Sequence, residues 1–273
     1  MKSIGEKMNE GIYIAVSGAL KQEKKMNVIA NNLANVNTSS FKKDQIAFES
    51  LLPPFNNKNR LTFDGSRNQL LPPDQSNLNV AYVGVAAHAT DLSQGELEPT
   101  NNNYDVALDG KGFFIVNTPD GVAYTRKGSF HLDSNKKLVD LNGNPVQSGQ
   151  GGGDIVIQGQ GGKITIDQKG IISIGKGLGN IRVGKIGVVD FVNGEKMVKI
   201  GDGIFKPVNE DVTGNEPQET RVLQGFVEQS NVKSVDEMTK MIETVRAFET
   251  YQKVIQTIDS VDERAVNSLG RIG

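Results

Sequence analysis

Cysteine and tryptophan are both absent from this chain of 273 residues. Without a thiol the chain has no cysteine nucleophile, no cysteine-ligated zinc, no iron–sulfur cluster and no disulfide. The absence fits two settings: a protein of the reducing cytosol, and a chain that is exported unfolded and must not cross-link. Composition by itself favours the cytosolic interpretation and leaves the second one open.

Long apolar runs and an excess of one charge are missing as well. No stretch approaches the roughly 18 to 20 apolar residues that cross a bilayer, so we expect no integral membrane segment. Residues 1–10 are charged and no uninterrupted apolar stretch follows them, so we expect no ordinary secretory signal. The 30 basic and 32 acidic residues give a net charge of -2 without a long run of either sign. This balance predicts no nucleic-acid partner.

A seven-residue apolar repeat marks the N-terminal region. Its members are Ile12, Ala19, Met26 and Leu33, and the stripe is widened by Val16, Ile29 and Ala30. The repeat predicts an amphipathic helix that ends near Ala34. Asparagines at positions 31, 32, 35 and 37 crowd this end. Because asparagine tolerates the left-handed conformation, we expect these residues to end the helix in that way.

The C-terminal region repeats the pattern. Ser234 followed by Glu237 is a capping box that predicts the helix start, and Gly270 is a natural stop. Apolar residues then recur mostly at spacings of three and four: Met238, Met241, Ile242, Val245, Phe248, Tyr251, Ile255 and Ile258. We therefore predict a second long amphipathic helix.

Residues 80–227 contain most of the 31 glycines among short runs rich in valine, isoleucine and phenylalanine. We expect strands at 113–116, 155–157, 164–166 and 171–174, and turns at 119–121 and 141–144. Asn193-Gly194 predicts a hairpin that joins 186–192 to 195–200. The fold class is therefore α+β, divided into an N-terminal helix with an extended segment (1–52), an extended linker (53–79), a central all-β domain (80–227) and a C-terminal helix (228–273).

The two terminal helices need partners for their apolar stripes. The nearest partner of each is the other helix, which would give an antiparallel coiled-coil pair with apolar surface left over for neighbouring copies. The alternative is that both helices pack on the β domain in an ordinary compact protein.

Motifs that carry chemistry are incomplete throughout. His88 and His131 each stand alone, Gly161-Gly162-Lys163 lacks the first glycine and the hydroxyl residue of a phosphate loop, and Asp140-Leu141-Asn142-Gly143-Asn144 lacks the turn glycine and the bidentate Glu of a calcium loop. We therefore predict no catalytic residue, no cofactor and no metal. A rival hypothesis is a cytoplasmic enzyme or ligand-binding protein with a pocket lined by Asp105, Asp109, Tyr124 and Arg126.

Three blocks of residues resemble the flagellar rod and hook protein family. The first is 30–38 (ANNLANVNT) followed by Phe41-Lys42. The second is 92–97 (LSQGEL), 112–114 (GFF) and 123–130 (AYTRKGSF). The third is 228–232 (EQSNV) and 246–249 (RAFE). Together they span most of the chain, and the first is highly specific.

The resemblance implies a structural, non-enzymatic subunit of the flagellar basal body that transmits torque for motility. Members are exported unfolded by the flagellar type III apparatus without a cleaved signal, and they span the periplasm or cell wall after export. Their terminal helices pair and form the inner coiled-coil layer of a hollow tube. The implied partners of this chain are further copies of itself and other rod and hook proteins. The chain ending from 247 to 271 is more similar to proximal-rod members, while the middle is equally similar to distal-rod members.

The helix stripes and the first block together give the expected assembly interface. It consists of Ile12, Ala19, Met26, Asn31, Asn32, Leu33, Asn35, Asn37, Phe41, Met238, Met241, Ile242, Val245, Phe248, Tyr251, Ile255 and Ile258.

Overall fold

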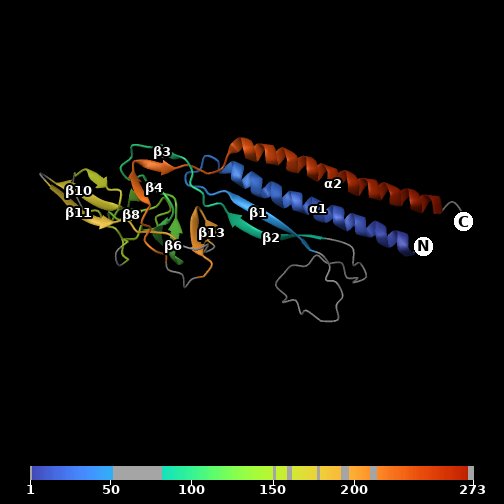
Figure 1. The fold of residues 1–273 in the computed structure, drawn as a ribbon, viewed down its shortest axis with the longest axis horizontal. Helices are drawn as coiled ribbons and strands as arrows, with labels where there is room; N and C mark the ends of the chain where they lie inside the picture. The colour runs from blue at the N-terminus through green and yellow to red at the C-terminus, as the bar shows by residue number, and fades with distance from the viewer. Residues whose placement is uncertain are drawn as a thin grey trace. The chain divides into compact units, whose positions relative to one another are not determined.

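A computed structural model describes residues 2–51, 82–149, 152–158, 162–176, 179–191, 197–209 and 214–269. It contains an N-terminal helix, a β-rich middle and a C-terminal helix, which confirms the α+β class (Figure 1). The chain divides into two units. The helical unit comprises 1–31, 45–89 and 235–273, and the β unit comprises 32–44 and 90–234. None of the helices in the described ranges is long and apolar enough to cross a membrane.

Helix α1 (Lys2–Ala34) and helix α2 (Ser234–Leu269) lie at the two ends of the chain. The predicted end of α1 at Ala34 and the predicted start of α2 at Ser234 are both confirmed. Asp236 and Glu237 lie in the first turn of α2, where carboxylates interact favourably with the positive end of the helix dipole.

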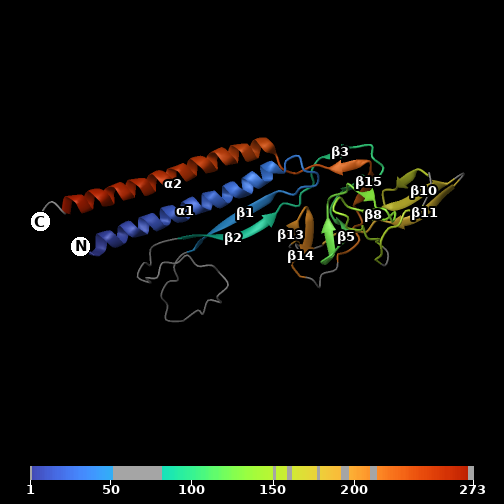
Figure 2. The ribbon, with the colours of Figure 1, turned by 180° about the vertical axis from the view of Figure 1, so that it is seen from behind.

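Two glycines of α1 lie against side chains of α2 within the helical unit, and the helices are drawn side by side in Figures 1 and 2. A Cβ atom at Gly18 would lie 2.4 Å from Cε1 of Tyr251, and one at Gly11 would lie 3.5 Å from Cδ1 of Ile258. A step of seven residues forward along α1 thus corresponds to seven residues backward along α2. Where they touch, the helices therefore run in opposite directions.

Strands β1 (Asp44–Leu51) and β2 (Tyr82–Thr90) form a two-stranded sheet. The ammonium of Lys21 on α1 lies 5.0 Å from the ring centre of Phe48 on β1, within the range of a cation–π contact. The expected linker at 53–79 lies outside the described residues.

The β unit contains the remaining sheets. A five-stranded sheet has the order β12-β5-β6-β14-β13, and a three-stranded sheet has the order β11-β10-β9. Three pairs complete the described part: β15-β4, β16-β3 and β7-β8. The bounds are β3 Leu97–Pro99, β4 Val106–Asp109, β5 Phe113–Thr118, β6 Gly121–Thr125, β7 His131–Leu132, β8 Leu138–Val139, β9 Ile164–Ile166, β10 Ile171–Lys176, β11 Gly179–Lys185, β12 Val188–Val189, β13 Met197–Gly201, β14 Ile204–Pro207, β15 Arg221–Gln224 and β16 Phe226–Glu228.

A hydrophobic core joins these sheets. Phe114 on β5 is fully buried and packs edge-on against Phe130, with ring centroids 5.2 Å apart. Leu108, Ile172 and Ile186 belong to the same cluster. Close backbone approach explains the glycine at 128, since a Cβ there would lie 1.5 Å from the carbonyl oxygen of Val106.

Several strand predictions are confirmed. β5, β9 and β10 cover the segments expected at 113–116, 164–166 and 171–174. The predicted turn at 119–121 joins β5 to β6, which pair from Thr118 and Gly121 onward. At the predicted turn 141–144, the carboxylate of Asp140 accepts hydrogen bonds from the backbone amides of Asn142 and Asn144. This carboxylate therefore organises a turn.

Two strand predictions are wrong. The segment 155–157 contains only an isolated bridge, between Val156 and Lys137. The predicted hairpin is contradicted because β12 and β13, on either side of Asn193-Gly194, lie at opposite edges of the five-stranded sheet. Its turn lies outside the described residues. Strand pairing here follows burial beside Phe113 and Phe114, the partners of β12, rather than local turn propensity.

Candidate functional site

The segment after α1 is held by short backbone hydrogen bonds and one asparagine side chain. The amides of Asn35 and Val36 donate to the carbonyls of Asn32 and Leu33, which tightens the last turn. The buried Asn32 side chain donates to the carbonyl of Asp44 and accepts from the Asp44 amide, both at 2.9 Å. Asn32 thus pairs with the start of β1 as a neighbouring strand would.

The expected left-handed asparagines are not found. Among the described non-glycine residues, positive φ occurs at Ser40, Asn101, Lys136 and Asp202, and therefore not at Asn35 or Asn37. The left-handed residue of this segment is Ser40, with φ 56°. The prediction was wrong because the tightened last turn ends α1 without a change in the sign of φ, and the chain reverses only several residues later.

Phe41 is buried in the β unit beneath a lysine. The Lys199 ammonium lies 3.8 Å from the centre of the Phe41 ring and also donates to the Asp44 carboxylate at 3.1 Å. Lys199 comes from β13, the edge strand of the five-stranded sheet. A cation–π contact and an ion pair therefore fasten this segment to that edge.

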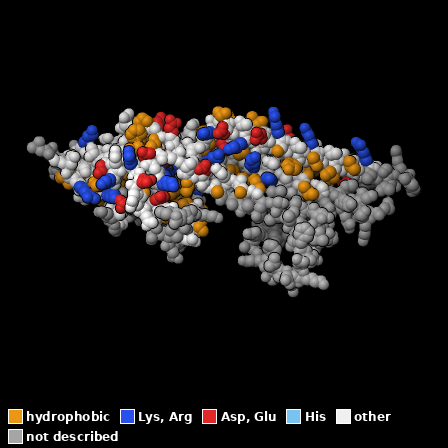
Figure 3. All heavy atoms as spheres, viewed as in Figure 1, with side chains coloured by type: hydrophobic (Ala, Val, Ile, Leu, Met, Phe, Trp, Pro, Cys, Tyr) orange, Lys and Arg blue, Asp and Glu red, His pale blue; other side chains and the backbone are white. Residues whose placement is uncertain are grey.

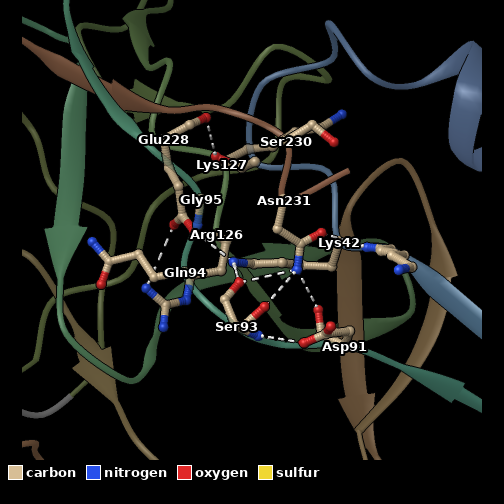
Figure 4. A network of polar contacts seen from close by, with 12 residues as sticks. Lys42, Asp91, Ser93, Gln94, Gly95, Arg126, Lys127, Glu228, Ser230 and Asn231 are labelled. Carbon is tan, nitrogen blue, oxygen red and sulfur yellow. Dashed lines mark hydrogen bonds and ion pairs between the residues drawn. The ribbon is translucent and has the colours of Figure 1, made fainter. Parts of the chain in front are cut away.

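Lys42 and Glu228 form a fully buried ion pair (Figure 4). The Lys42 ammonium donates to Oε1 of Glu228 at 2.5 Å and to the carbonyl of Ser93 at 2.6 Å. The same Oε1 accepts from the Gly95 amide at 2.8 Å. Burial, the largest influence, lowers the pKa of Lys42 below its usual range, although Glu228 opposes the shift.

Arg126 adds a second cation. Its Nη2 donates to the carbonyl of Gly110 at 2.8 Å, its guanidinium lies 5.5 Å from the Phe113 ring centre, and its Nη1 lies 3.6 Å from Oε2 of Glu228. Burial lowers the pKa of Arg126.

The pocket of the rival hypothesis combined Arg126 with Asp105, Asp109 and Tyr124. In the described part of the chain no recorded contact joins these three residues to Arg126: Asp105 pairs with Asn102, Tyr124 packs on Phe191, and Asp109 is exposed.

Asn231 ties the chain before α2 to two other segments. Its Oδ1 accepts from the Lys43 amide at 2.8 Å, while its Nδ2 donates to the carbonyls of Asp91 and Ser93 (Figure 4). The Ser93 amide donates to the Asp91 carboxylate and lowers its pKa.

The contacts of Asn32, Phe41, Lys42, Arg126 and Asn231 lie in one region of the β unit. We call this region, residues 32–44, 91–95, Arg126 and 228–231, the junction.

The helices carry most of the exposed apolar surface. Nine of the fifteen exposed large hydrophobic residues in the described part lie on α1 or α2, and Figure 3 shows hydrophobic side chains over these helices. They are Tyr13, Ile14, Val16, Leu20, Val235, Met238, Ile242, Val254 and Val261. Exposed large hydrophobic residues are therefore more numerous on the two helices than in the described part of the β unit.

The predicted interface residues fall into three groups. Met238, Ile242, Asn31 and Asn37 are exposed, and Asn32 and Phe41 are buried in the junction. The others are half-buried: Ile12, Ala19, Met26, Leu33, Asn35, Met241, Val245, Phe248, Tyr251, Ile255 and Ile258. Of these residues, Tyr251 lies against Gly18 of α1 and Ile258 lies near Gly11 of α1. Contact with another subunit stays a prediction for the whole set.

Three stretches of the chain match known families. Residues 12–42 match the family described as flagella basal body rod protein, residues 107–174 the flagellar hook protein FlgE/F/G D1 domain, and residues 223–269 the flagellar basal body rod FlgEFG protein C-terminal family. The flagellar basal-body rod protein FlgG of Borreliella burgdorferi is 36% identical over 93% of this chain and 96% of its own length. The chain belongs to the flagellar basal-body rod protein family.

The relatives include proteins named FlgF and proteins named FlgG. The flagellar basal-body rod protein FlgF of Caulobacter vibrioides is 32% identical over 97% of this chain and 100% of its own length. The flagellar basal-body rod protein FlgG of Bacillus subtilis is 33% identical over 95% of this chain and 99% of its own length. The chain is thus a structural protein of the flagellar basal-body rod.

The three matched stretches each contribute one charge to the junction. Lys42 is the last residue of the first, Arg126 lies in the second and Glu228 in the third. Sequence reasoning quoted all three residues within the family motifs but missed that they meet. No one-dimensional signal pairs a lysine with a glutamate 186 residues away.

Proposed function

We propose that this rod subunit assembles with copies of itself and with other rod and hook proteins through the exposed faces of α1 and α2. The observation that carries the proposal is the apolar surface of the two helices, above all Met238 and Ile242 in the N-terminal half of α2, which are 51% and 55% exposed. Burying such side chains in a subunit interface contributes about 25 cal/mol per Å² of apolar area.

We further propose that α1 and α2 pair as an antiparallel coiled coil. Support comes from the contacts of Gly18 with Tyr251 and of Gly11 with Ile258, which are separated by one heptad on each helix. The pairing covers one side of each helix, and the exposed residues on the other side are left for neighbours.

Export and the lack of catalysis belong to the same proposal. The chain is exported unfolded through the flagellar type III apparatus, and the absence of cysteine prevents disulfide cross-linking during export. Its role is mechanical, the transmission of torque along the axial structure, without a catalytic site.

The position along the rod is the finer question. We favour the proximal rod because residues 247–271 resemble its members. A position in the distal rod is the second candidate because the middle of the chain is equally similar to distal-rod members. A density map of purified basal bodies with this chain placed in it distinguishes the two positions.

Single charge insertions on α2 test the assembly surface. Ile242→Glu and Met238→Glu each place a carboxylate in a predicted interface, so we expect loss of rod incorporation and of motility. Thr239→Glu is the matched control, because Thr239 is exposed in the same turn and is not part of the predicted interface. Circular dichroism of the purified chains should show equal helix content for all three. Normal motility with Ile242→Glu would show that this face is not an assembly surface.

A further inference from the structure

Three charged side chains from distant segments meet inside the β unit. Lys42 follows α1, Arg126 follows β6, and Glu228 ends β16. Their side chains are 0%, 4% and 1% exposed. Both ion pairs use the carboxylate of Glu228, which lies 2.5 Å from the Lys42 ammonium and 3.6 Å from Nη1 of Arg126.

Removal of the carboxylate would leave two cations buried beside each other. An ion pair that loses one partner inside a protein is strongly destabilised, because the remaining charge stays desolvated without compensation. The cations also oppose each other, since Arg126 acts to lower the pKa of Lys42 whereas Glu228 acts to raise it. Asp91 also acts to raise the pKa of Lys42, but less strongly than Arg126 acts to lower it. The burial of a charged Lys42 therefore depends mainly on the charge of Glu228.

Glu228 and Arg126 are held by the β framework and do not need Lys42. Glu228 pairs with Leu97 in the β16-β3 ladder, and its Oε1 also accepts from the Gly95 amide. Arg126 is anchored on Gly110 and Phe113. The framework can thus present a carboxylate before the N-terminal segment arrives.

Residues 38–44 are held in a different way, because they precede or only begin β1. Within this connecting segment, the Ser40 amide donates to the carbonyl of Glu228 at 2.7 Å, and the Lys43 amide donates to Asn231. The Asn231 amide in turn donates to the carbonyl of Phe41. Residues 228–231 therefore hold the middle of the connecting segment, while Lys199 and Asn32 hold its end at Asp44.

We propose that the carboxylate of Glu228 is a conditional lock for the connecting segment: residues 38–44 dock on the β unit only when a charged Glu228 is in place to neutralise Lys42. The lock couples the segment that follows α1 (residues 38–44) to the segment that precedes α2 (residues 228–231). The two terminal segments consequently become ordered together, and an N-terminal segment without its C-terminal counterpart stays undocked. This coupling is a property of the single chain and does not rest on the assembly proposed above.

Hydrogen exchange of the full chain, followed by mass spectrometry, tests the lock. In Glu228→Gln the backbone carbonyl that accepts from Ser40 and the size of the side chain are unchanged, while the charge is lost and one acceptor oxygen becomes an NH2 group. We expect protection of residues 40–44 to fall by on the order of a hundredfold, while amides of β5 such as Ile115 keep theirs. Glu98→Gln is the matched control, since Glu98 lies on the paired strand β3 and is exposed, and a glutamine oxygen there can still accept the hydrogen bond from the Gln229 side chain. It should leave the connecting segment protected.

A second substitution separates charge from hydrogen bonding. Adding Lys42→Met to Glu228→Gln removes one of the two cations that have lost the Glu228 carboxylate, so we expect protection of residues 40–44 to recover by tenfold or more relative to Glu228→Gln alone. If the double variant is as exposed as Glu228→Gln or more so, the segment is held by hydrogen bonds and the lock is refuted. Equal loss of protection in β5 would also overturn it, because Glu228 would then support the whole unit.

Discussion

Ser40 is the left-handed residue in the segment that follows α1. Its φ of 56° lies in the left-handed region, yet its side chain is almost completely buried and its amide donates to Glu228. A non-glycine residue in this conformation carries strain, which neighbouring contacts must offset. The Ser40 hydroxyl contributes only a long hydrogen bond of 3.4 Å to the same carbonyl. The residue at position 40 must therefore above all tolerate a positive φ, whereas its hydroxyl group contributes little.

Substitutions at Ser40 test that demand. Ser40→Gly keeps the amide and relieves the left-handed strain, so we expect a free energy of unfolding within about 1 kcal/mol of the wild type. Ser40→Val places a β-branched side chain at positive φ and should lose roughly 1–3 kcal/mol. Urea denaturation followed by circular dichroism measures both. Ser39→Val, at a neighbouring residue outside the positive-φ set, is the control and should change little.

At the scale of elements, α1 and α2 meet through glycine on one side and large side chains on the other. Gly18 is buried beneath the ring of Tyr251, whereas Gly11 is half-buried near Ile258. A glycine inside a helix costs about 1 kcal/mol relative to alanine. The position of Gly18 is explained by the space that the tyrosine ring requires, because a Cβ there would overlap it.

A pair of alanine substitutions separates helix propensity from packing. Gly11→Ala adds a Cβ at an ordinary contact distance, so we expect a gain of about 0.5–1 kcal/mol in stability. Gly18→Ala forces Tyr251 aside, and we expect the gain in propensity to be cancelled or reversed. Thermal unfolding of the helical signal distinguishes the two variants. Adding Tyr251→Leu to Gly18→Ala should recover stability, and an equal gain from both alanines alone would mean that the Tyr251 contact is absent.

The elements also show which features could be predicted from the sequence. The start of α2 at Ser234 and the strands β5, β9 and β10 follow from local chemistry. The end of α1 at Ala34 was predicted correctly, although the left-handed asparagines expected there are not found. The partners of β12 and β13 do not follow from local chemistry, because pairing between strands far apart in the chain depends on burial that no local pattern encodes. The junction was missed for the same reason. Lys42 looks like an ordinary surface lysine until Glu228 is placed beside it.

At the scale of the whole molecule, hydrophobic burial is distributed unevenly between the two units. Among residues with described side chains, the buried hydrophobics of the helical unit are Ala15 and Ile29, while the β unit contains the aromatic and aliphatic core around Phe114. The β unit therefore contributes most of the stability that apolar burial supplies to the isolated chain. If the proposed assembly through α1 and α2 is right, we expect partner subunits to bury further apolar surface of the helical unit.

Buried charge gives the molecule a pH dependence of unusual sign. The pKa of Lys42 is lowered, chiefly by burial and also by Arg126, against the opposing influence of Glu228 and Asp91. Below this lowered pKa, the folded chain bears the cost of holding a desolvated ammonium. As the pH rises toward the ordinary lysine value of 10.5, the folded chain releases the proton before the unfolded chain does. The contribution of Lys42 to stability should therefore increase with pH in this alkaline window.

Urea unfolding of the wild type and of Lys42→Met across pH 7 to about 11 measures this contribution as a difference, so that other titrating groups cancel. We expect the free energy of unfolding of the wild type, relative to Lys42→Met, to rise through the window. Lys137 is the control of opposite sign, because its hydrogen bond to Asp154 raises its pKa. Its contribution is complete below the ordinary lysine pKa and is lost as the pH rises through the raised value, so the difference between the wild type and Lys137→Met should fall. A wild-type advantage over Lys42→Met that also falls with rising pH would mean that the ion pair with Glu228 outweighs the cost of burying the ammonium.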